Sequence, residues 1–386
     1  MLHTTDTAGH EVAGRKSCSV LQLSMRRAHD LVAFCLSYEF EDVVAQLTAA
    51  DRVDVVDFPA VERVRRMYKI ARLASGSKRL ARAMAPGVSQ APLTRDYDLF
   101  FPIFNHPFEL FALAAVPDWR ARCRVSACFV SELWADDLPE YLLELLSSFD
   151  HVFLGVQDAV GAVSRIIGKP CTYLPLATDV LLFAPSPSLP RNIDVCNVGR
   201  RSPVTHAALI RLARERRIFY YYDTIHARGH HDRQITFRVN DPAEHRLLLA
   251  NLIQRSRYFV ANRARVNEPE GGASKQEISA RFYEGIAAGA VLIGEEPRSE
   301  EFRRQFDWPD AVVHLPFDSP DVGEVLAGLD ADPARLERVH RENVRQAARR
   351  HDWLYRLRTV FDAAGIPPTE AMQARHDRLM ALSGHP

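Results

Sequence analysis

The sequence has no excess of charge of either sign, since its 386 residues include 49 lysines and arginines and 49 aspartates and glutamates. Proteins dedicated to nucleic-acid binding usually carry a positive excess, so no nucleic-acid partner is expected. Long apolar runs are also missing, and the longest candidate, residues 285–294, is far shorter than a membrane-spanning helix. The first 25 residues contain charged side chains and lack the apolar segment of a secretion signal.

Cysteine pairs with the spacing of metal sites are absent as well. The six cysteines form no C-x-x-C motif, and the nearest two, Cys123 and Cys128, are five positions apart. We therefore expect reduced, mostly buried thiols in a cytoplasmic protein. Three histidines, His226, His230 and His231, share one loop, but no fixed spacing supplies the further ligands that a metal ion needs. No metal site is expected.

Short β-rich runs alternate with helical patterns along the whole chain, which is typical of α/β domains with parallel sheets. A proline-rich stretch at residues 184–190 separates two such series. We expect an N-terminal domain at residues 1–184, a C-terminal domain at 185–365, and a last helix within 366–386 that packs back on the N-terminal domain. The fold class is thus two tandem doubly wound, Rossmann-like domains that face each other across a cleft. In such folds the ligand binds at the carboxyl ends of the strands. Strands are expected at residues 19–23, 53–58, 98–104, 124–130, 151–156 and 171–175, and then at 194–198, 218–222, 235–239, 257–261, 291–294 and 311–314.

The first candidate binding loop lies at residues 192–203. An apolar strand ends at Gly199, and a helix opens near Pro203, a favourable first-turn residue. The glycine lets the backbone approach a ligand closely, while the helix N-terminus and the side chains of Arg200 and Arg201 suit a phosphate group. An ordinary strand-to-helix turn with two solvated arginines explains the same pattern.

The second candidate loop, residues 270–290, is rich in glycine and leads through Ser274, a plausible N-cap, into a helix expected at 277–288. Glu277 and Glu284 are seven positions apart and would share a helix face, with Arg281 between them. A solvated Glu–Arg–Glu ladder is one interpretation. The other is that the helix N-terminus faces a pyrophosphate while Glu284 accepts hydrogen bonds from a ribose.

The run Arg281-Phe-Tyr-Glu284 with the following Gly-Ile-Ala-Ala-Gly-Ala-Val-Leu-Ile293 resembles the group 1 glycosyltransferases of GT-B fold. It is most similar to the branch that includes spore-maturation-type proteins. Residues 194–203 resemble that family's arginine-bearing phosphate loop, residues 175–185 its N-domain end, and residues 352–356 a helix near its C-terminus. The resemblance covers roughly residues 95–365.

The resemblance implies transfer of a sugar from a nucleotide-diphosphate sugar, bound mainly by the C-terminal domain, with no further cofactor. It implies a metal-independent reaction and favours retention of anomeric configuration. Glu284 matches the glutamate that binds the donor ribose, and Arg200 the phosphate-loop arginine, with Arg201 as the adjacent alternative. The usual glutamate eight positions earlier is Gln276 here, with Glu277 beside it. The usual lysine of the phosphate site is not evident, and Lys275 is the candidate for its charge.

The N-terminal domain is expected to bind the acceptor, which the sequence leaves open as a glycan, a lipid-linked sugar or a small molecule. His106 and Glu132 each follow a predicted strand, and either could take the acceptor's proton. Alternatively, His106 merely caps the helix that follows it. Two further functions remain open, a catalytically silent sugar-nucleotide-binding scaffold, which the Gln276 substitution motivates, and a nucleotide-sugar epimerase.

A basic stretch runs from Arg63 to Arg82, with eight lysines and arginines and no acid. Apolar residues such as Val64 and Ile70 recur within it at helical spacing. The stretch is either a solvated helix face or a surface for an anionic membrane or an anionic acceptor. A peripheral contact with the inner face of the membrane is the corresponding expectation.

Overall fold

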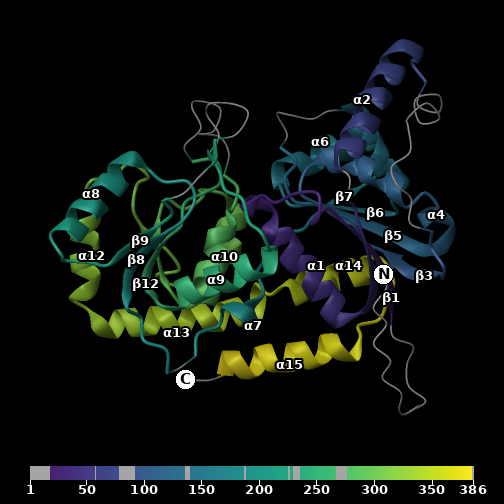
Figure 1. Ribbon diagram of the computed structural model, residues 1–386. Coiled ribbons are helices and arrows are strands. Elements are labelled where there is room, and N and C mark those ends of the chain that lie inside the picture. Colours follow the sequence, from purple (N-terminus) through teal and green to yellow (C-terminus); the bar gives the residue numbers. More distant parts are fainter. Residues whose placement is uncertain are drawn as a thin grey trace.

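The computed structural model describes residues 18–56, 58–77, 92–134, 140–186, 188–224, 227–228, 235–266 and 276–384. Within these ranges, no helix is both long and apolar enough to cross a bilayer. Two parallel sheets form the framework, one in each half of the chain (Figure 1).

The N-terminal sheet has seven strands in the order β2-β1-β3-β5-β6-β7, with β4 paired to β5. All its neighbouring strands are parallel. The expected strand at 53–58 was misplaced, because the strand beside β1 is the half-exposed edge strand β2. The strands are β1 (Ser19–Ser24), β2 (Ala49–Asp54), β3 (Tyr97–Phe100), β4 (Ile103–Phe104), β5 (Cys123–Val130), β6 (His151–Leu154) and β7 (Cys171–Tyr173).

The C-terminal sheet has five parallel strands in the order β14-β13-β12-β8-β9. The expected strand at 235–239 is instead part of a separate two-stranded antiparallel pair. The strands of the sheet are β8 (Ile193–Asn197), β9 (Tyr220–Tyr222), β12 (Ser256–Val260), β13 (Val291–Gly294) and β14 (Val313–His314), and the separate pair is β10 (Ala227–Arg228) with β11 (Ile235–Thr236).

Helices connect the strands and cover the faces of both sheets (Figure 1). The region around Pro107 forms a 3-10 helix, η2, whose first residue is preset for a helical turn. The helices of the N-terminal half are η1 (Val32–Phe34), α1 (Cys35–Leu47), α2 (Phe58–Ser75), η2 (Pro107–Ala115), α4 (Trp119–Arg122), α5 (Glu140–Leu143), η3 (Glu144–Ser148), η4 (Gln157–Ala159), α6 (Val160–Ile167) and α7 (Val180–Phe183). Those of the C-terminal half are α8 (Pro203–Arg214), α9 (Pro242–Gln254), α10 (Ala280–Ala287), α11 (Glu300–Gln305), α12 (Val322–Asp330), α13 (Pro333–Arg350), α14 (Trp353–Ala363) and α15 (Glu370–Gly384).

One hydrophobic core is shared by the two domains. Strand residues alternate between faces, so Phe129 of β5 and Phe259 of β12 belong to this shared core, while Cys128 and Tyr258 face other clusters. Helices α1, α9, α10 and α14 contribute to the shared core from both halves of the chain. The domains are therefore fused along one side rather than joined by a linker alone.

The expected domain boundary at residue 184 falls between α7 and β8. Helix α14, which the sequence places in the C-terminal domain, packs against α1 of the N-terminal domain, where Trp353 stacks on Phe40 with ring centroids 4.3 Å apart. The last helix, α15, lies along α13, and just before it the Thr369 hydroxyl donates to the carbonyl of Leu47 (2.6 Å). The end of the chain thus crosses back over the domain junction.

Candidate active site

A cavity of about 710 Å³ lies between the two domains. The loops that line it follow the carboxyl ends of strands in both sheets, as expected for doubly wound domains. Residues of the C-terminal wall include Gly199, Arg200, Asn262, Arg281 and Glu284, and residues of the N-terminal wall include His106, Ser131, Glu132 and Trp134.

The turn from β8 to α8 forms one end of the C-terminal wall. Gly199 has φ +77°, a conformation that favours glycine, and a Cβ at this position would displace the guanidinium of Arg281. Its N–H donates to Asp223 Oδ2 (2.5 Å), which fixes the turn. Helix α8 then starts at Pro203, with Ser202 as the N-cap accepting from Thr205 N (3.1 Å).

The two arginines of this turn lie in different places. Arg200 is exposed and lines the cavity. Arg201 is half-buried, donates to the carbonyl of Asp223 (2.8 Å) and lies over the ring of Tyr222. Of the two candidates, the structure therefore brings Arg200 to the cavity and uses Arg201 to hold the end of β9.

Helix α10 starts later than the sequence predicted. It begins at Ala280, with Ser279 as N-cap, so Glu277 precedes the helix and does not share a helix face with Glu284. The solvated Glu–Arg–Glu ladder, one of the two interpretations of the sequence, is therefore wrong. Ser274, Lys275 and the glycine-rich loop lie outside the described residues, so the predicted N-cap and the candidate phosphate lysine cannot be placed.

Glu284 pairs with an arginine that the sequence analysis did not identify. Its carboxylate accepts from Arg246 Nη1 of α9, and Arg246 Nε also donates to Glu39 of α1 (2.7 Å). The side chains of Arg246 and Glu39 are 5% exposed and that of Glu284 is 6% exposed. Burial alone would lower the pKa of Arg246, but the two carboxylates outweigh it and raise that pKa.

Glu39 makes the most hydrogen bonds of the three residues in this buried cluster, Glu39, Arg246 and Glu284. Its Oε1 accepts from the amide of Asp179 (2.8 Å), the hydroxyl of Thr178 (3.1 Å) and the indole N–H of Trp353 (2.9 Å). Burial raises its pKa despite the attraction of Arg246. The cluster thus connects Glu284 at the cavity with α1, with the chain that joins the domains, and with α14.

Arg281 lies against the turn from β8 to α8. Its Nε donates to the carbonyl of Val198 (3.1 Å), and its guanidinium touches the backbone of Gly199. Burial lowers its pKa, the nearby charge of Glu284 opposes this shift, and that of Arg200 acts in the same direction as burial. A half-buried arginine therefore adds positive charge beside the backbone of Gly199, at which a phosphate is expected from the sequence.

Glu277 joins the two domains. Its Oε1 accepts from the backbone N–H groups of Gln157 (3.0 Å) and Asp158 (3.4 Å), which begin the 3-10 helix η4 of the N-terminal domain. Burial raises the pKa of Glu277 to about 7, although these two amides favour the ionised form. Gln276 accepts from the backbone N–H of Arg298 (2.6 Å). Gln276, eight positions before Glu284, and the adjacent Glu277 therefore both accept hydrogen bonds from backbone N–H groups of the protein.

The N-terminal wall places His106 and Glu132 at the cavity, as expected. His106 also caps η2, because its Nδ1 accepts from the N–H of Phe108 (3.3 Å). Behind them lies Glu109, which accepts from the N–H of Asn105 (2.6 Å) and is 3.4 Å from His29 Nε2. Burial raises the pKa of Glu109 to about 7 and lowers that of His29 to about 4.

Comparisons with known proteins agree with this arrangement. Residues 198–362 match the family model described as glycosyl transferase-like. A glycosyltransferase from Rickettsia africae aligns with 91% of this chain and 98% of its own, at 9% identity and a TM-score of 0.51. An alpha-glucosyltransferase in complex with UDP and a 13-mer DNA containing an HMU base aligns with 90% of this chain and 99% of its own, at 8% identity and a TM-score of 0.53. No curated protein sequence matches the chain.

The fold is GT-B. The family match covers most of the second Rossmann-like domain, including Gly199, Arg200, Arg281 and Glu284. The inter-domain cavity described above therefore lies where a GT-B protein has its cleft between two Rossmann-like domains.

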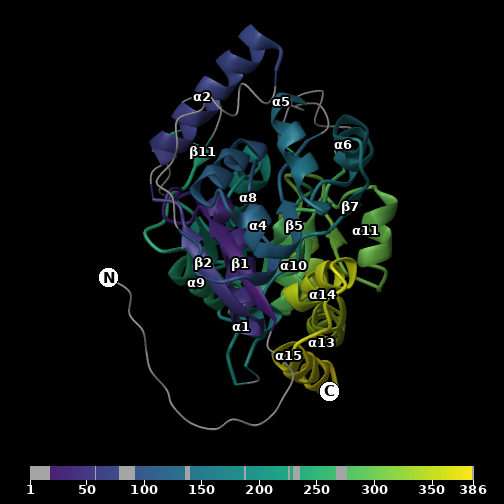
Figure 2. The same ribbon diagram turned by 90° about the vertical axis from the view of Figure 1, so that its right-hand side faces the viewer.

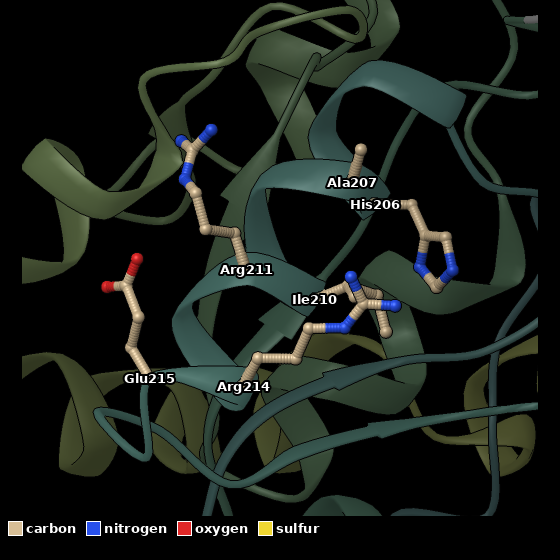
Figure 3. A pocket seen from close by; sticks show the side chains of 6 residues that line it. All are labelled: His206, Ala207, Ile210, Arg211, Arg214 and Glu215. Carbon is tan, nitrogen blue, oxygen red and sulfur yellow. The ribbon is translucent and has the colours of Figure 1, made fainter.

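A second hollow lies on the outside of the GT-B fold, along α8. Figure 3 shows the side chains that line it, which come from α8 and from Glu215 directly after the helix and do not converge on one point. His206 is held there by Tyr220, whose hydroxyl is 2.9 Å from His206 Nδ1. In the described part of the chain, no three histidines, cysteines or carboxylates gather as a metal site would require, and His226, His230 and His231 lie outside that part.

Proposed function

We propose that the protein is a glycosyltransferase that moves a sugar from a nucleotide-diphosphate sugar to an acceptor hydroxyl. Within the group 1 glycosyltransferases, the run from Arg281 to Ile293 supports the spore-maturation-type branch. The observation that carries the proposal is the cavity between the carboxyl ends of two parallel sheets, with Gly199, Arg200 and Glu284 together on its C-terminal wall.

The donor is proposed to lie along this wall. Its diphosphate faces the Gly199–Arg200 turn, where the exposed Arg200 and the half-buried Arg281 supply positive charge. The Glu284 carboxylate, held by Arg246, accepts hydrogen bonds from the ribose hydroxyls. Lys275 is the further candidate for the phosphate site.

In the proposed reaction, the acceptor oxygen bonds to the anomeric carbon on the same face of the sugar from which the diphosphate oxygen leaves, so that the configuration is retained. The electron pair goes to the nucleoside diphosphate, whose charge Arg200 stabilises, and the acceptor's proton goes to Glu132 or His106 on the opposite wall. The resemblance to the family supports retention of configuration and independence of a metal ion.

A second candidate, a sugar-nucleotide-binding protein without activity, is favoured by one observation. Gln276 and Glu277 both make contacts within the protein, so neither is positioned by the structure as a dedicated ligand of the donor sugar. Such a protein would keep the diphosphate and ribose contacts and lack turnover.

The test is donor binding and turnover with the full chain. A panel of nucleoside diphosphates and their sugars is screened by thermal shift, because a ligand bound to the folded state raises its apparent stability. Release of nucleoside diphosphate from the best donor is then followed with candidate acceptors and with a chelator present. Turnover that Arg200→Ala abolishes supports the enzyme, tight binding without turnover supports the silent protein, and no binding of any nucleoside diphosphate contradicts both.

A further inference from the structure

The outward face of α2 combines three exposed apolar side chains with three exposed cations. Met67, Ile70 and Leu73 are 41%, 62% and 77% exposed. They follow one another at intervals of three residues, so they form one row along the helix. The exposed cations Arg63, Arg66 and Lys69 form an adjacent row at the same spacing. We call these six residues the α2 outer face.

The opposite side of α2 carries a separate set of apolar residues, which pack in the core. Val61, Val64, Tyr68 and Ala71 are buried in the core of the N-terminal domain. The exposed apolar row is therefore not needed for packing, and burying a leucine that is 77% exposed would be favourable.

Two further arginines of α2 make contacts at its flanks. Arg65 contacts Glu62 (2.5 Å) and lies over the ring of Phe108, and Arg72 is 3.5 Å from Glu144. The helix carries five cations and a single acid, Glu62, in a chain whose net charge is zero. The α2 outer face contains no acid.

We propose that the α2 outer face docks the protein on an anionic lipid bilayer. Apolar side chains that enter the headgroup region beside cations that meet anionic headgroups are the two components of interfacial binding by a helix. The net-neutral chain concentrates positive charge on this helix, which provides the charge complementarity. The proposal goes beyond sugar transfer and does not depend on it.

A second copy of the chain is a less favourable binding partner for the α2 outer face than an anionic bilayer. In a symmetric dimer the same patch would meet itself, so Arg63, Arg66 and Lys69 of one copy would face the same cations of the other. Like charges brought together in this way oppose association.

The position of α2 suits a surface contact. It projects from the N-terminal domain at the end of the molecule opposite α15 in both views (Figures 1 and 2). Its inner side packs on η2, where Tyr68 and Phe111 have ring centroids 5.4 Å apart. Because η2 begins directly after His106, the proposed bilayer contact lies on the helix that supports the N-terminal wall of the cleft.

The test is co-sedimentation of the full chain with vesicles of phosphatidylcholine alone or with about 30% phosphatidylglycerol, at about 0.05 M and about 0.5 M salt. We expect binding to the anionic vesicles at low salt, at least about tenfold weaker binding to the neutral ones, and loss at high salt. Binding that ignores lipid charge, or no binding to anionic vesicles, overturns the proposal without any variant.

Two triple variants locate the contact. Replacing the apolar row, M67S/I70S/L73S, and reversing the cation row, R63E/R66E/K69E, should each reduce partitioning about tenfold or more. The matched control, R338E/R341E/R349E, makes the same charge change on exposed residues of α13, far from α2 (Figure 1). It should retain binding within about twofold.

Unchanged binding by the α2 variants, or equal loss by the α13 control, overturns the assignment to this face. All six α2 positions are exposed, so an unchanged melting temperature is expected and is measured for each variant. If an α2 variant unfolds, the wild-type dependence on lipid charge and salt and the α13 control still decide the proposal. Binding of an acidic soluble protein with no vesicle binding would also reject it.

Discussion

The two walls of the cleft are built in different ways. On the C-terminal wall, the buried Glu284 is fixed by the buried Arg246, and the half-buried Arg281 is fixed by the backbone carbonyl of Val198. On the N-terminal wall, His106 and Glu132 lie at loops after strands, and His106 caps the 3-10 helix η2. The C-terminal wall is therefore pre-organised, which suits a part of the ligand that stays the same. The N-terminal wall is supported by its own loops, which suits a part of the ligand that varies. In the proposed function these parts are the nucleotide and the acceptor.

The largest effect, on the free energy of unfolding, is expected when Arg246 is replaced, because its side chain on the C-terminal wall lies between two buried carboxylates. Arg246→Met leaves Glu39 and Glu284 buried together without their cation, and breaking such a cluster costs about 3–5 kcal/mol. Urea unfolding monitored by tryptophan fluorescence measures the loss. The matched control, Arg200→Met, changes an exposed arginine and should leave the free energy of unfolding within about 0.5 kcal/mol.

A triple variant separates loss of the cation from loss of packing. E39Q/R246M/E284Q removes all three charges, so it should recover a substantial part of the stability that Arg246→Met loses. If Arg246→Met costs no more than Arg200→Met, the buried cluster does not hold the wall.

This cluster also shows why sequence analysis could find Glu284 but not its partner. Arg246 is 38 residues from Glu284 and 207 from Glu39, so no local spacing connects them. The helix pattern was misleading as well, since Leu247 and Leu248 beside Arg246 are 52% and 56% exposed while the arginine is buried. Such an inversion follows from contacts between two domains, which one helix's periodicity does not contain.

The sheets were easier to predict because buried parallel strands are continuous apolar runs, as at Val291–Gly294. The turn from β8 to α8 was also located, because Gly199 and Pro203 have conformational requirements that are visible in the sequence. The start of α10 was missed because Ser274 offered the same local capping signal as Ser279, the N-cap in the structure. The loops of the proposed site and Glu284 could therefore be predicted from the sequence. The side chains that hold them, such as Arg246, could be identified only from the fold.

The next effect tests whether the two arginines of the turn from β8 to α8 differ. Arg200→Ala should weaken binding of a nucleoside diphosphate by about 1.5–3 kcal/mol, because a charged hydrogen-bond donor is lost at the diphosphate. Arg201→Ala is the control and should have a smaller effect, since Arg201 is bonded to Asp223. Isothermal titration with the nucleoside alone should show almost no change for either variant. Equal losses for the diphosphate and the nucleoside would remove Arg200 from the phosphate site.

A smaller effect is expected at the ribose. Glu284→Gln keeps the shape of the side chain and removes its charge, so the preference for a ribonucleoside diphosphate over its 2′,3′-dideoxy analogue should fall by about 1–1.5 kcal/mol. The ratio of the two affinities is the measurement, because a general loss of stability affects both ligands alike. If the variant discriminates as well as the wild type, Glu284 serves only its ion pair with Arg246.

The smallest effect concerns Glu277, which connects the C-terminal wall with the N-terminal domain. Its pKa is about 7 in the folded protein, above its ordinary value of 4.5, because burial disfavours the ionised form and Asp158 and Glu301 add negative charge. The folded state therefore binds more protons than the unfolded state between these values. Its contribution to stability is fully present below about pH 4.5 and is lost as the pH rises through about 7.

Glu277→Gln keeps an oxygen acceptor for the amides of Gln157 and Asp158 and removes the titration. The stability of the wild type relative to this variant should therefore decrease between pH 5 and 8, with a slope below about 1.4 kcal/mol per pH unit, the limit for one proton. Glu342→Gln is the control, because hydrogen bonding to Arg345 lowers the pKa of Glu342 and its titration lies below this range. Urea unfolding across the range measures both. Parallel curves for wild type and Glu277→Gln would mean that Glu277 stays ionised in the folded protein, and the inter-domain contact would then be a charged one throughout.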